Sequence, residues 1–375
     1  MTRPILVVVS LRGGVDALNA VVPYRDVDYY RLRPTLAIPP PGKARRAAID
    51  LNGFYGLHPS LAPIVPLWER RELAVVHAVG WPGVSHSHFE AWEEIEAGAV
   101  GANRPPSGWL ARALALSPEE NASALRAVAF ADTMPILLSG SPGATAVRSL
   151  DELRLAADGP RRRSLAASLR LLYGQAAPPV GAAGIAALDA AAAIEGRAGA
   201  ASSSSRAGSA FARQLGMIAR LIQAGVGLET AAVELGGWDF HFGAGSTEGP
   251  MARLLAEFAE GVAAFANDLG PDWNRVVLVA ISEFGRRAQE NGSGGTDHGQ
   301  GGLIVVAGGG VRGGRVAGEW PGLSARRLAG PGDLAITTDF RDVLLEVLPH
   351  GLSSAERERV FPRYQKKREL GLLPA

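Results

Sequence analysis

The feature that most constrains the fold is a set of short apolar runs in which hydrophobic residues do not alternate regularly with polar ones. A strand with one face in water alternates, whereas a strand covered on both faces is apolar almost throughout. Covered strands of this kind belong mainly to parallel sheets that carry helices on both sides. The runs are Ile5–Leu11, Leu73–Val79, Ala127–Phe130, Ala231–Leu235, Val276–Ile281 and Leu303–Ala307.

Segments with a helical pattern lie between these runs or follow them. Strands that alternate with helices are typical of an α/β fold. We therefore predict an α/β fold with a mostly parallel sheet and helices on both faces, built by a single domain over residues 1–375. The segments with the helical pattern are Phe89–Glu96, Ser209–Ala224, Met251–Leu269 and Asp339–Leu348.

Residues 176–208 break this pattern, because Ala, Gly and Ser dominate and large apolar side chains are few. The Ala-rich part is compatible with a helix, whereas the run Ser202–Ser205 is typical of a flexible loop. We interpret the segment as a loose excursion within the domain.

Charge and composition exclude several classes of function. The formal net charge is +1, which gives no electrostatic basis for nucleic acid or an anionic membrane as the main partner. The short basic runs 161–163 and 366–368 are interpreted as solvated surface. No apolar segment approaches the length needed to cross a membrane, and the first apolar run is predicted to be a strand and not a signal peptide. We expect a cytoplasmic protein, and its oligomeric state is left open.

The absence of cysteine bears directly on chemistry. Disulfides, thiolate nucleophiles and cysteine-ligated metals are excluded, so that any metal site must use oxygen and imidazole ligands. Charged and polar residues, most of them with oxygen or imidazole groups, gather beside the strands, where open α/β sheets place their functional groups. They are Arg12, Asp16, Ser87, His88, Asp239, His241, Glu283, Arg286, Asp297 and His298. Carboxylates and imidazoles together suit one or two divalent ions such as zinc, manganese or iron.

Several of these residues also have an ordinary structural explanation. Asp16 could cap or brace the turn after the first strand. Asp239 and His241 could form an Asx-turn with a packed imidazole beside it, and Asp297 with His298 could belong to a solvated glycine-rich loop.

Glu283 is harder to explain in this way, because a buried carboxylate is costly without a cation. Arg286 could provide that cation in a structural ion pair. Ser85 and Ser87 precede a helix, where serine is a common N-cap. Ser87 at a helix N-terminus could also attack or hold a phosphoryl or sulfuryl group. The other histidines, expected to be core, structural or exposed, include His58, His77 and His350.

The motifs that carry these residues resemble the DUF1501 family, in order and over nearly the whole chain except about 150–210. They are Arg12-Gly13-Gly14-x-Asp16-x-Leu18-Asn19, Gly56-Leu57-His58-Pro59, Ser87-His88-Phe89, Gly236-Gly237-Trp238-Asp239-x-His241, Ser282-Glu283-Phe284-Gly285-Arg286, 290–299 and 337–342. The resemblance implies an alkaline-phosphatase-like fold, in a superfamily that includes sulfatases and cofactor-independent phosphoglycerate mutases. The family's own activity is largely unassigned.

The resemblance also implies roles for individual residues. Asp16, Asp239, His241, Glu283 and His298 match metal-binding positions of the superfamily, and Ser87 is similar to its nucleophile, with Ser85 the second choice. Two departures concern a second metal ion. The spacing of Asp239 and His241 is short, and Phe284 replaces the usual His or Asn, so that one ion, or a site rebuilt with His88 or Asp297, is an alternative.

These inferences lead to one main hypothesis and two rivals. The main hypothesis is a metal-dependent hydrolase or transferase for a phosphate or sulfate ester, or a similar anionic group, of a small molecule. Arg12 and Arg286 would neutralise charge in the transition state. The rivals are a non-catalytic protein that binds a ligand or partner on the same fold, and a mutase or lyase for a phosphorylated or sulfonated metabolite.

Overall fold

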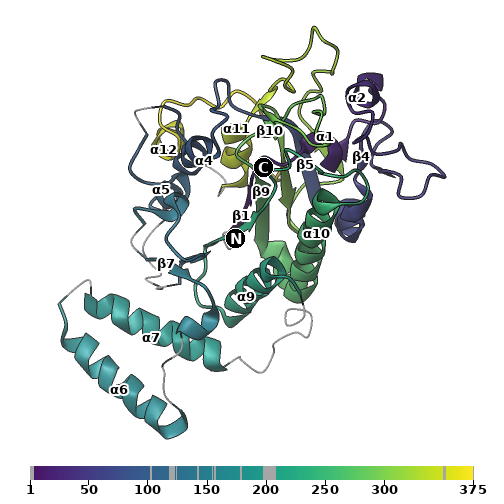
Figure 1. The fold of residues 1–375 in the computed structure, drawn as a ribbon. Helices are drawn as coiled ribbons and strands as arrows, with labels where there is room; N and C mark the ends of the chain where they lie inside the picture. The colour runs from purple at the N-terminus through teal and green to yellow at the C-terminus, as the bar shows by residue number, and fades with distance from the viewer. Residues whose placement is uncertain are drawn as a thin grey trace.

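A nine-stranded mixed sheet forms the centre of the molecule (Figure 1). The structure, a computed structural model, describes residues 4–101, 104–117, 123, 125–141, 143–153, 155, 158–177, 180–196, 208–348 and 352–374. The strand order is β13-β5-β12-β9-β1-β8-β6-β7, and β14 also pairs with β5. The strands are β1 (Ile5–Arg12), β5 (Leu73–Gly80), β6 (Ala127–Phe130), β7 (Ala144–Val147), β8 (Thr230–Gly236), β9 (Val276–Ile281), β12 (Gly302–Ala307), β13 (Arg315–Ala317) and β14 (Thr338–Asp339).

The strand directions confirm the predicted α/β fold with a mostly parallel sheet. Strand β1 pairs in parallel with β8 and with β9, and β6 pairs in parallel with β8 and β7. Strand β12 alone runs against the others, because it is antiparallel to both β5 and β9. All six predicted strands are present, although the sequence pattern did not indicate the reversed direction of β12.

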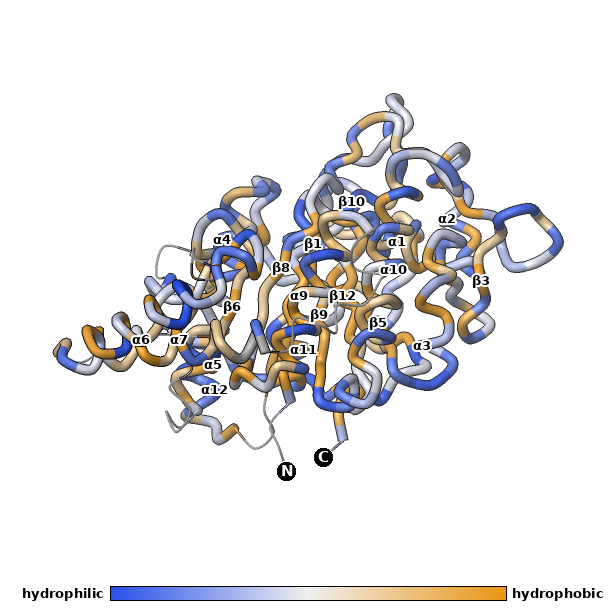
Figure 2. The backbone as a smooth tube through the Cα atoms, turned by 90° about the horizontal axis from the view of Figure 1, so that it is seen from below, coloured by the Kyte–Doolittle hydropathy of each residue, from blue (hydrophilic) through white to orange (hydrophobic). Residues whose placement is uncertain are grey.

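Helices cover both faces of the sheet, as predicted, and alternate residues of β1 show how. Val7 and Val9 pack on the side of α9 and α10, whereas Leu6 and Val8 pack on the opposite side. The first face carries α3 (Val65–Glu69), α9 (Ala210–Ala224) and α10 (Pro250–Leu269), and the second carries α4 (His88–Ala97), α5 (Trp109–Leu114), α11 (Phe340–Val347) and α12 (Ser354–Val360). Figure 2 shows hydrophobic residues along the central strands and hydrophilic residues on the outer loops.

Local signals fix the ends of the main helices. Ser209 caps α9 by accepting a hydrogen bond from the Ala212 N–H, and Gly225 ends this helix in the left-handed conformation. The four predicted helices are confirmed with ends that differ by a few residues at most. The short elements are α1 (Ala17–Ala20), α2 (Val27–Leu32), 3-10 turns at Pro59–Ile64, Ile136–Leu138, Leu150–Leu153 and Gly270–Arg275, a sheet of β2 (Val21–Val22), β4 (Gly56–Leu57) and β3 (Ile49–Asp50), and a hairpin of β10 (Gly285–Arg286) and β11 (His298–Gly299).

A helical hairpin of α6 (Gly159–Gln175) and α7 (Val180–Gly196) projects from the sheet and its helices (Figure 1). The Ala-rich part of the predicted excursion is therefore helical, and α6 was not predicted. The Ser202–Ser205 loop lies outside the described residues, and the single-domain assignment stays a prediction. No helix in the described part of the chain is long and apolar enough to cross a membrane.

His77 lies in the core, as expected, on β5 between the small sheet and the main one. Its Nε2 donates to the Val21 carbonyl at 3.1 Å and its Nδ1 accepts from the Ala78 N–H at 3.0 Å. Both ring nitrogens of the neutral imidazole are thus satisfied. A proton on Nδ1 would point at the Ala78 N–H, which is itself a donor. Burial also disfavours the charged ring and lowers the pKa of His77 to about 4.

We predict that this histidine makes the fold acid-sensitive. The unfolded chain takes up the proton near pH 6.5, whereas the folded chain resists it until about pH 4, so that stability falls as the pH drops through this window. Between pH 7 and pH 5 the loss from His77 should be about 2 kcal/mol. Urea unfolding of wild type and His77→Gln at both pH values measures it. The variant should lose less stability than wild type, and equal losses would contradict the prediction.

Candidate metal centre

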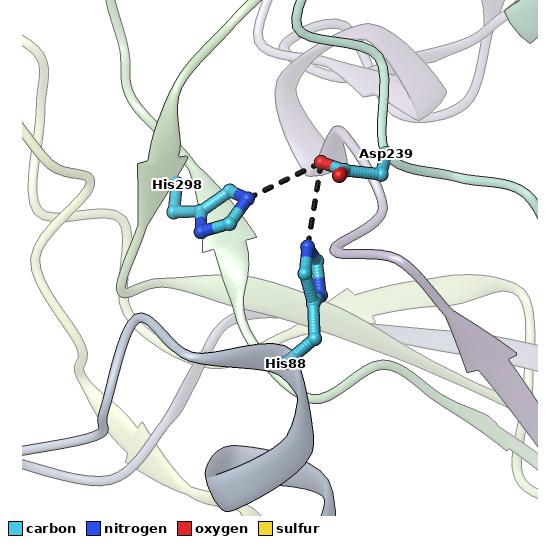
Figure 3. Close-up of side chains that lie close together, drawn as sticks. All are labelled: His88, Asp239 and His298. Carbon is cyan, nitrogen blue, oxygen red and sulfur yellow. Dashed lines mark hydrogen bonds and ion pairs between the residues drawn. The ribbon is translucent and has the colours of Figure 1, made fainter.

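Segments that follow the ends of β8 and β9 meet the start of α4 at one edge of the main sheet. Asp239 comes three residues after β8, His298 is in the β10–β11 hairpin that follows β9, and His88 is the first residue of α4. One ligand atom from each of these three side chains lies within 4.8 Å of the other two (Figure 3). Residues that are far apart in the sequence thus form a group able to share one metal ion.

A third imidazole extends this group. The Nε2 atoms of His88, His241 and His298 lie 3.4, 3.1 and 3.2 Å from one oxygen, Oδ1 of Asp239. The Nε2 atoms of His241 and His298 are 2.8 Å apart. We refer to these four side chains as the His/Asp cluster. Asp239 is partly exposed, so that the cluster is open to solvent.

The other nitrogen of each ring faces an acceptor. Nδ1 of His88 lies 2.7 Å from Oε1 of Glu283, and Nδ1 of His298 lies 2.7 Å from the His86 carbonyl oxygen. Nδ1 of His241 lies 3.4 Å from Oδ1 of Asp297. Carboxylates and carbonyls only accept hydrogen bonds, so that Nδ1 is the donor in all three rings. This is the arrangement in which metal-ligating histidines are usually held.

The hydrogen on Nδ1 determines what the cluster can bind. Each neutral ring then presents a lone pair on Nε2, and three lone pairs converge on a carboxylate oxygen. Nε2 of His88 is buried and has no hydrogen-bond partner among the described residues. Such a group of acceptors is stable only with a proton or a metal cation between its members. The donor set therefore fits a divalent metal ion.

Arg286 holds Asp239 in place. Its guanidinium donates to Oδ1 of Asp239 at 2.6 Å and to the carbonyls of Gly13, Gly14 and Thr296, and its side chain is 1% exposed. Partial burial alone would raise the pKa of Asp239. The hydrogen bond and charge of Arg286 outweigh this effect and lower the pKa to about 2. The donors of Arg286 are thus used inside the protein, and they hold the Asp239 carboxylate in position. The role of Arg286 in neutralising charge in a transition state stays a prediction.

Glu283 supports His88. The carboxylate is buried, and it accepts from the Gly13 N–H at 2.8 Å, from the Ser282 hydroxyl at 2.9 Å and from His88. Burial raises the pKa of Glu283, yet these hydrogen bonds bring it below its ordinary value. The hydrogen bond to Glu283 in turn raises the pKa of His88. The structure thus pairs Glu283 with a histidine, and not with Arg286 as its cation.

A glycine allows this contact. Gly13 has φ +123°, and a Cβ placed on it would lie 2.7 Å from the backbone nitrogens of Trp238 and Asp239. The chain after β1 can therefore approach the chain after β8 only without a side chain here. The Gly13 N–H in the same turn donates to Glu283.

Asn291 was missed as a site residue by reasoning from sequence. Its Nδ2 donates to the His241 carbonyl at 2.8 Å and to Oδ1 of Asp297 at 3.1 Å, and its Oδ1 accepts from two backbone N–H groups of the same loop. The hydrogen bond from Asn291 is the main reason that the pKa of Asp297 is lowered. The signal in the sequence was an asparagine that opens a glycine-rich loop just before Asp297.

Asp16 and Arg12 contact residues outside the His/Asp cluster. Oδ2 of Asp16 pairs with buried Arg33 at 2.6 Å, and Oδ1 accepts from the Asn19 N–H, which caps α1. These contacts match the alternative in which Asp16 caps or braces the turn after the first strand. Arg12 pairs with Glu234 at 3.2 Å and lies over the Trp92 ring.

Ser87 is exposed at the N-cap of α4, directly before His88. Its hydroxyl forms no capping hydrogen bond with the described residues of that helix, whereas Oγ of Ser85 accepts from the Ser87 N–H at 3.1 Å. The Ser87 hydroxyl is thus not committed to the helix. This is what a nucleophile requires, and its role stays a prediction.

Comparison with known proteins agrees with the motifs. The model of the family described as "Protein of unknown function (DUF1501)" matches residues 58–341. The chain belongs to the DUF1501 family. No curated protein matches this DUF1501 chain. The match includes the whole His/Asp cluster together with Glu283 and Arg286, whereas Arg12 and Asp16 precede it.

We predict that Glu283 controls the basicity of His88 in the metal-free DUF1501 protein. The hydrogen bond and the charge of Glu283 hold the pKa of His88 above its ordinary value, so that Glu283→Gln should lower this pKa. NMR titration of the His88 ring in both proteins measures the shift. A pKa of His88 that is the same in both would contradict the assignment of Glu283 as its partner.

Proposed function

We propose that this DUF1501 protein is a metal-dependent hydrolase or transferase that acts on a phosphate or sulfate ester, or a similar anionic group, of a small molecule. The observation that carries the proposal is the convergence of three Nε2 lone pairs on Oδ1 of Asp239, with each ring held by an acceptor at Nδ1. The likeness of the motifs to the alkaline phosphatase superfamily supports the choice of ester.

The donors favour one ion over two. His88, Asp239 and His298 would hold it, with His241 as a fourth donor. Asp16 is paired with Arg33, and the Phe284 ring lies 4.8 Å from both the His88 and the His298 rings, where the superfamily offers a further ligand. These contacts support the alternative of a one-ion site built with His88, which the sequence left open.

The chain's own residues would bind and orient an ester beside such an ion. When bound, a divalent ion supplies Lewis acidity to an ester oxygen. Ser87, exposed before the first turn of α4, is the candidate nucleophile, and the free N–H groups of that turn favour an anion. Arg12, partly exposed, is the candidate for contact with a second anionic group.

We predict that metal content depends on Asp239. Purified, chelator-free wild type should contain one equivalent of zinc, manganese or iron per chain, and Asp239→Asn should lose most of it, because the variant removes the only charged ligand of the cluster. Elemental analysis measures this, with Asp272→Asn, a surface partner of Arg275, as the matched control. A wild type that binds no divalent ion, or an Asp239→Asn protein that retains it, would overturn the proposed metal centre.

We also predict that replacing Ser87 and replacing Ser85 have different effects on turnover. Ser87→Ala should reduce turnover of aryl phosphate or aryl sulfate esters at least about a hundredfold, because the covalent route is lost. Metal content should not change. Ser85→Ala removes only the acceptor of the Ser87 N–H and serves as the control, with a loss of a few-fold. Equal losses in the two variants would refute Ser87 as the nucleophile.

The second candidate is a metal-dependent binding protein without turnover. It is favoured by the internal use of Arg286, whose donors go to Asp239 and backbone carbonyls and leave it 1% exposed. A metal-loaded protein that binds phosphate or sulfate but turns over no ester would support this candidate over the first.

A further inference from the structure

A buried carboxylate behind the His/Asp cluster lacks the partners that such a group requires. Asp333 is 0% exposed, and neither of its side-chain oxygens forms a hydrogen bond of good geometry in the described part of the chain, although the Gln300 carboxamide lies close enough to lower its pKa. Its backbone is fixed by two hydrogen bonds with Ala329, at 2.8 and 2.9 Å. A buried carboxyl group with so few partners is costly, whether or not it is ionised.

Two side chains that can carry positive charge face Asp333. Nε2 of His86 lies 3.7 Å from Oδ2, and Nε of Arg287 lies 3.9 Å from Oδ1. Nε of Arg287 is itself buried without a hydrogen-bond partner in the described part of the chain. Burial raises the pKa of Asp333, while His86, Arg287 and the nearby Gln300 carboxamide lower it in part. Both side chains thus face Asp333 at distances too long for direct hydrogen bonds.

Both side chains belong to residues whose backbone holds the metal centre. The His86 carbonyl accepts from Nδ1 of His298 at 2.7 Å. The Arg287 N–H donates to the Asp297 carbonyl at 3.0 Å, and the Asp297 carboxylate lies 3.4 Å from Nδ1 of His241. Asp333 is therefore connected to His298 through one residue, His86, and to His241 through two, Arg287 and Asp297.

We propose that Asp333 is a positioning residue of the metal centre, which holds the His86 and Arg287 side chains that face it and so fixes the His298 and His241 rings. The inference rests on the proposed function only in that the His/Asp cluster binds a metal ion. The anchor orders the His/Asp cluster before any ion binds, so that its loss weakens metal binding without removing a ligand. Such outer partners commonly change metal affinity 10- to 100-fold.

A purely structural role would have a different consequence. If Asp333 served only to complete its turn, its loss would destabilise the chain and leave the metal affinity of the folded protein unchanged. Asp342 provides a matched control. It is also 0% exposed with one unpartnered oxygen, Oδ2, but its other oxygen accepts from Tyr364 and Lys367, away from the cluster.

The test compares zinc affinity and metal-free stability in full-length wild type, Asp333→Asn and Asp342→Asn. Zinc affinity is measured by competition with a chelating dye, and stability by the Tm of the metal-free proteins. Asp333→Asn should bind zinc at least about tenfold more weakly. Asp342→Asn should bind zinc as wild type does, whatever its Tm. Unchanged affinity in Asp333→Asn, or an equal loss in both variants, would overturn the inference.

A second variant keeps the inference testable if Asp333→Asn does not fold. His86→Gln removes the imidazole that faces Asp333 and retains the carbonyl that accepts from His298. It should weaken zinc binding a few-fold, because the connection from Asp333 to His298 runs through His86. Wild-type affinity in His86→Gln would overturn the inference alone, whereas a wild type that binds no zinc would overturn the proposed metal centre as well.

Discussion

The arrangement of the site depends on one guanidinium. Arg286 stands just after β9 and donates to the carbonyls of Gly13 and Gly14 after β1, to Thr296 in the loop before β11, and to the Asp239 carboxylate after β8. It therefore joins three neighbouring strand ends of the sheet and one hairpin. A side chain with no acceptor capacity and five donors suits this task, and lysine could not replace it. The buried charge is tolerated because carbonyl oxygens and one carboxylate surround it.

Two carboxylates that the sequence predicted as metal ligands contact other protein groups in the structure. Asp16 is held by Arg33 and caps α1, while Glu283 holds His88 by its Nδ1. His88 in turn brings its Nε2 to the cluster, which matches the alternative of a site built with His88. In this arrangement Glu283 contacts a candidate ligand and His88 offers a nitrogen donor, a ligand type that zinc and iron accept.

The sequence predicted the sheet better than the site, for a physical reason. Burial on both faces leaves a continuous apolar run, such as Val276–Ile281, that can be read without knowing what covers it. The polar residues after the strands were also found, because parallel strands bring their carboxyl ends together. Which of them meet could not be read, because Asp16 and Asp239 look alike until the position of Arg33 is known. Asp333 gave no signal, since a loop aspartate after Gly332 has no periodic context.

The charges around the cluster are matched to a divalent ion. With the three imidazoles neutral, four carboxylates lie in or behind the cluster, those of Asp239, Glu283, Asp297 and Asp333. Two guanidiniums, Arg286 and Arg287, face two of them, and the His86 imidazole also faces Asp333, so that with all four carboxylates ionised and His86 neutral two negative charges remain. A doubly charged cation bound among the Nε2 atoms and Asp239 would balance this excess. Burial raises the pKa of Asp333, and the positive charge of Arg287 and of such a cation would favour its ionised form. Its negative charge belongs to a set that a bound divalent ion would complete.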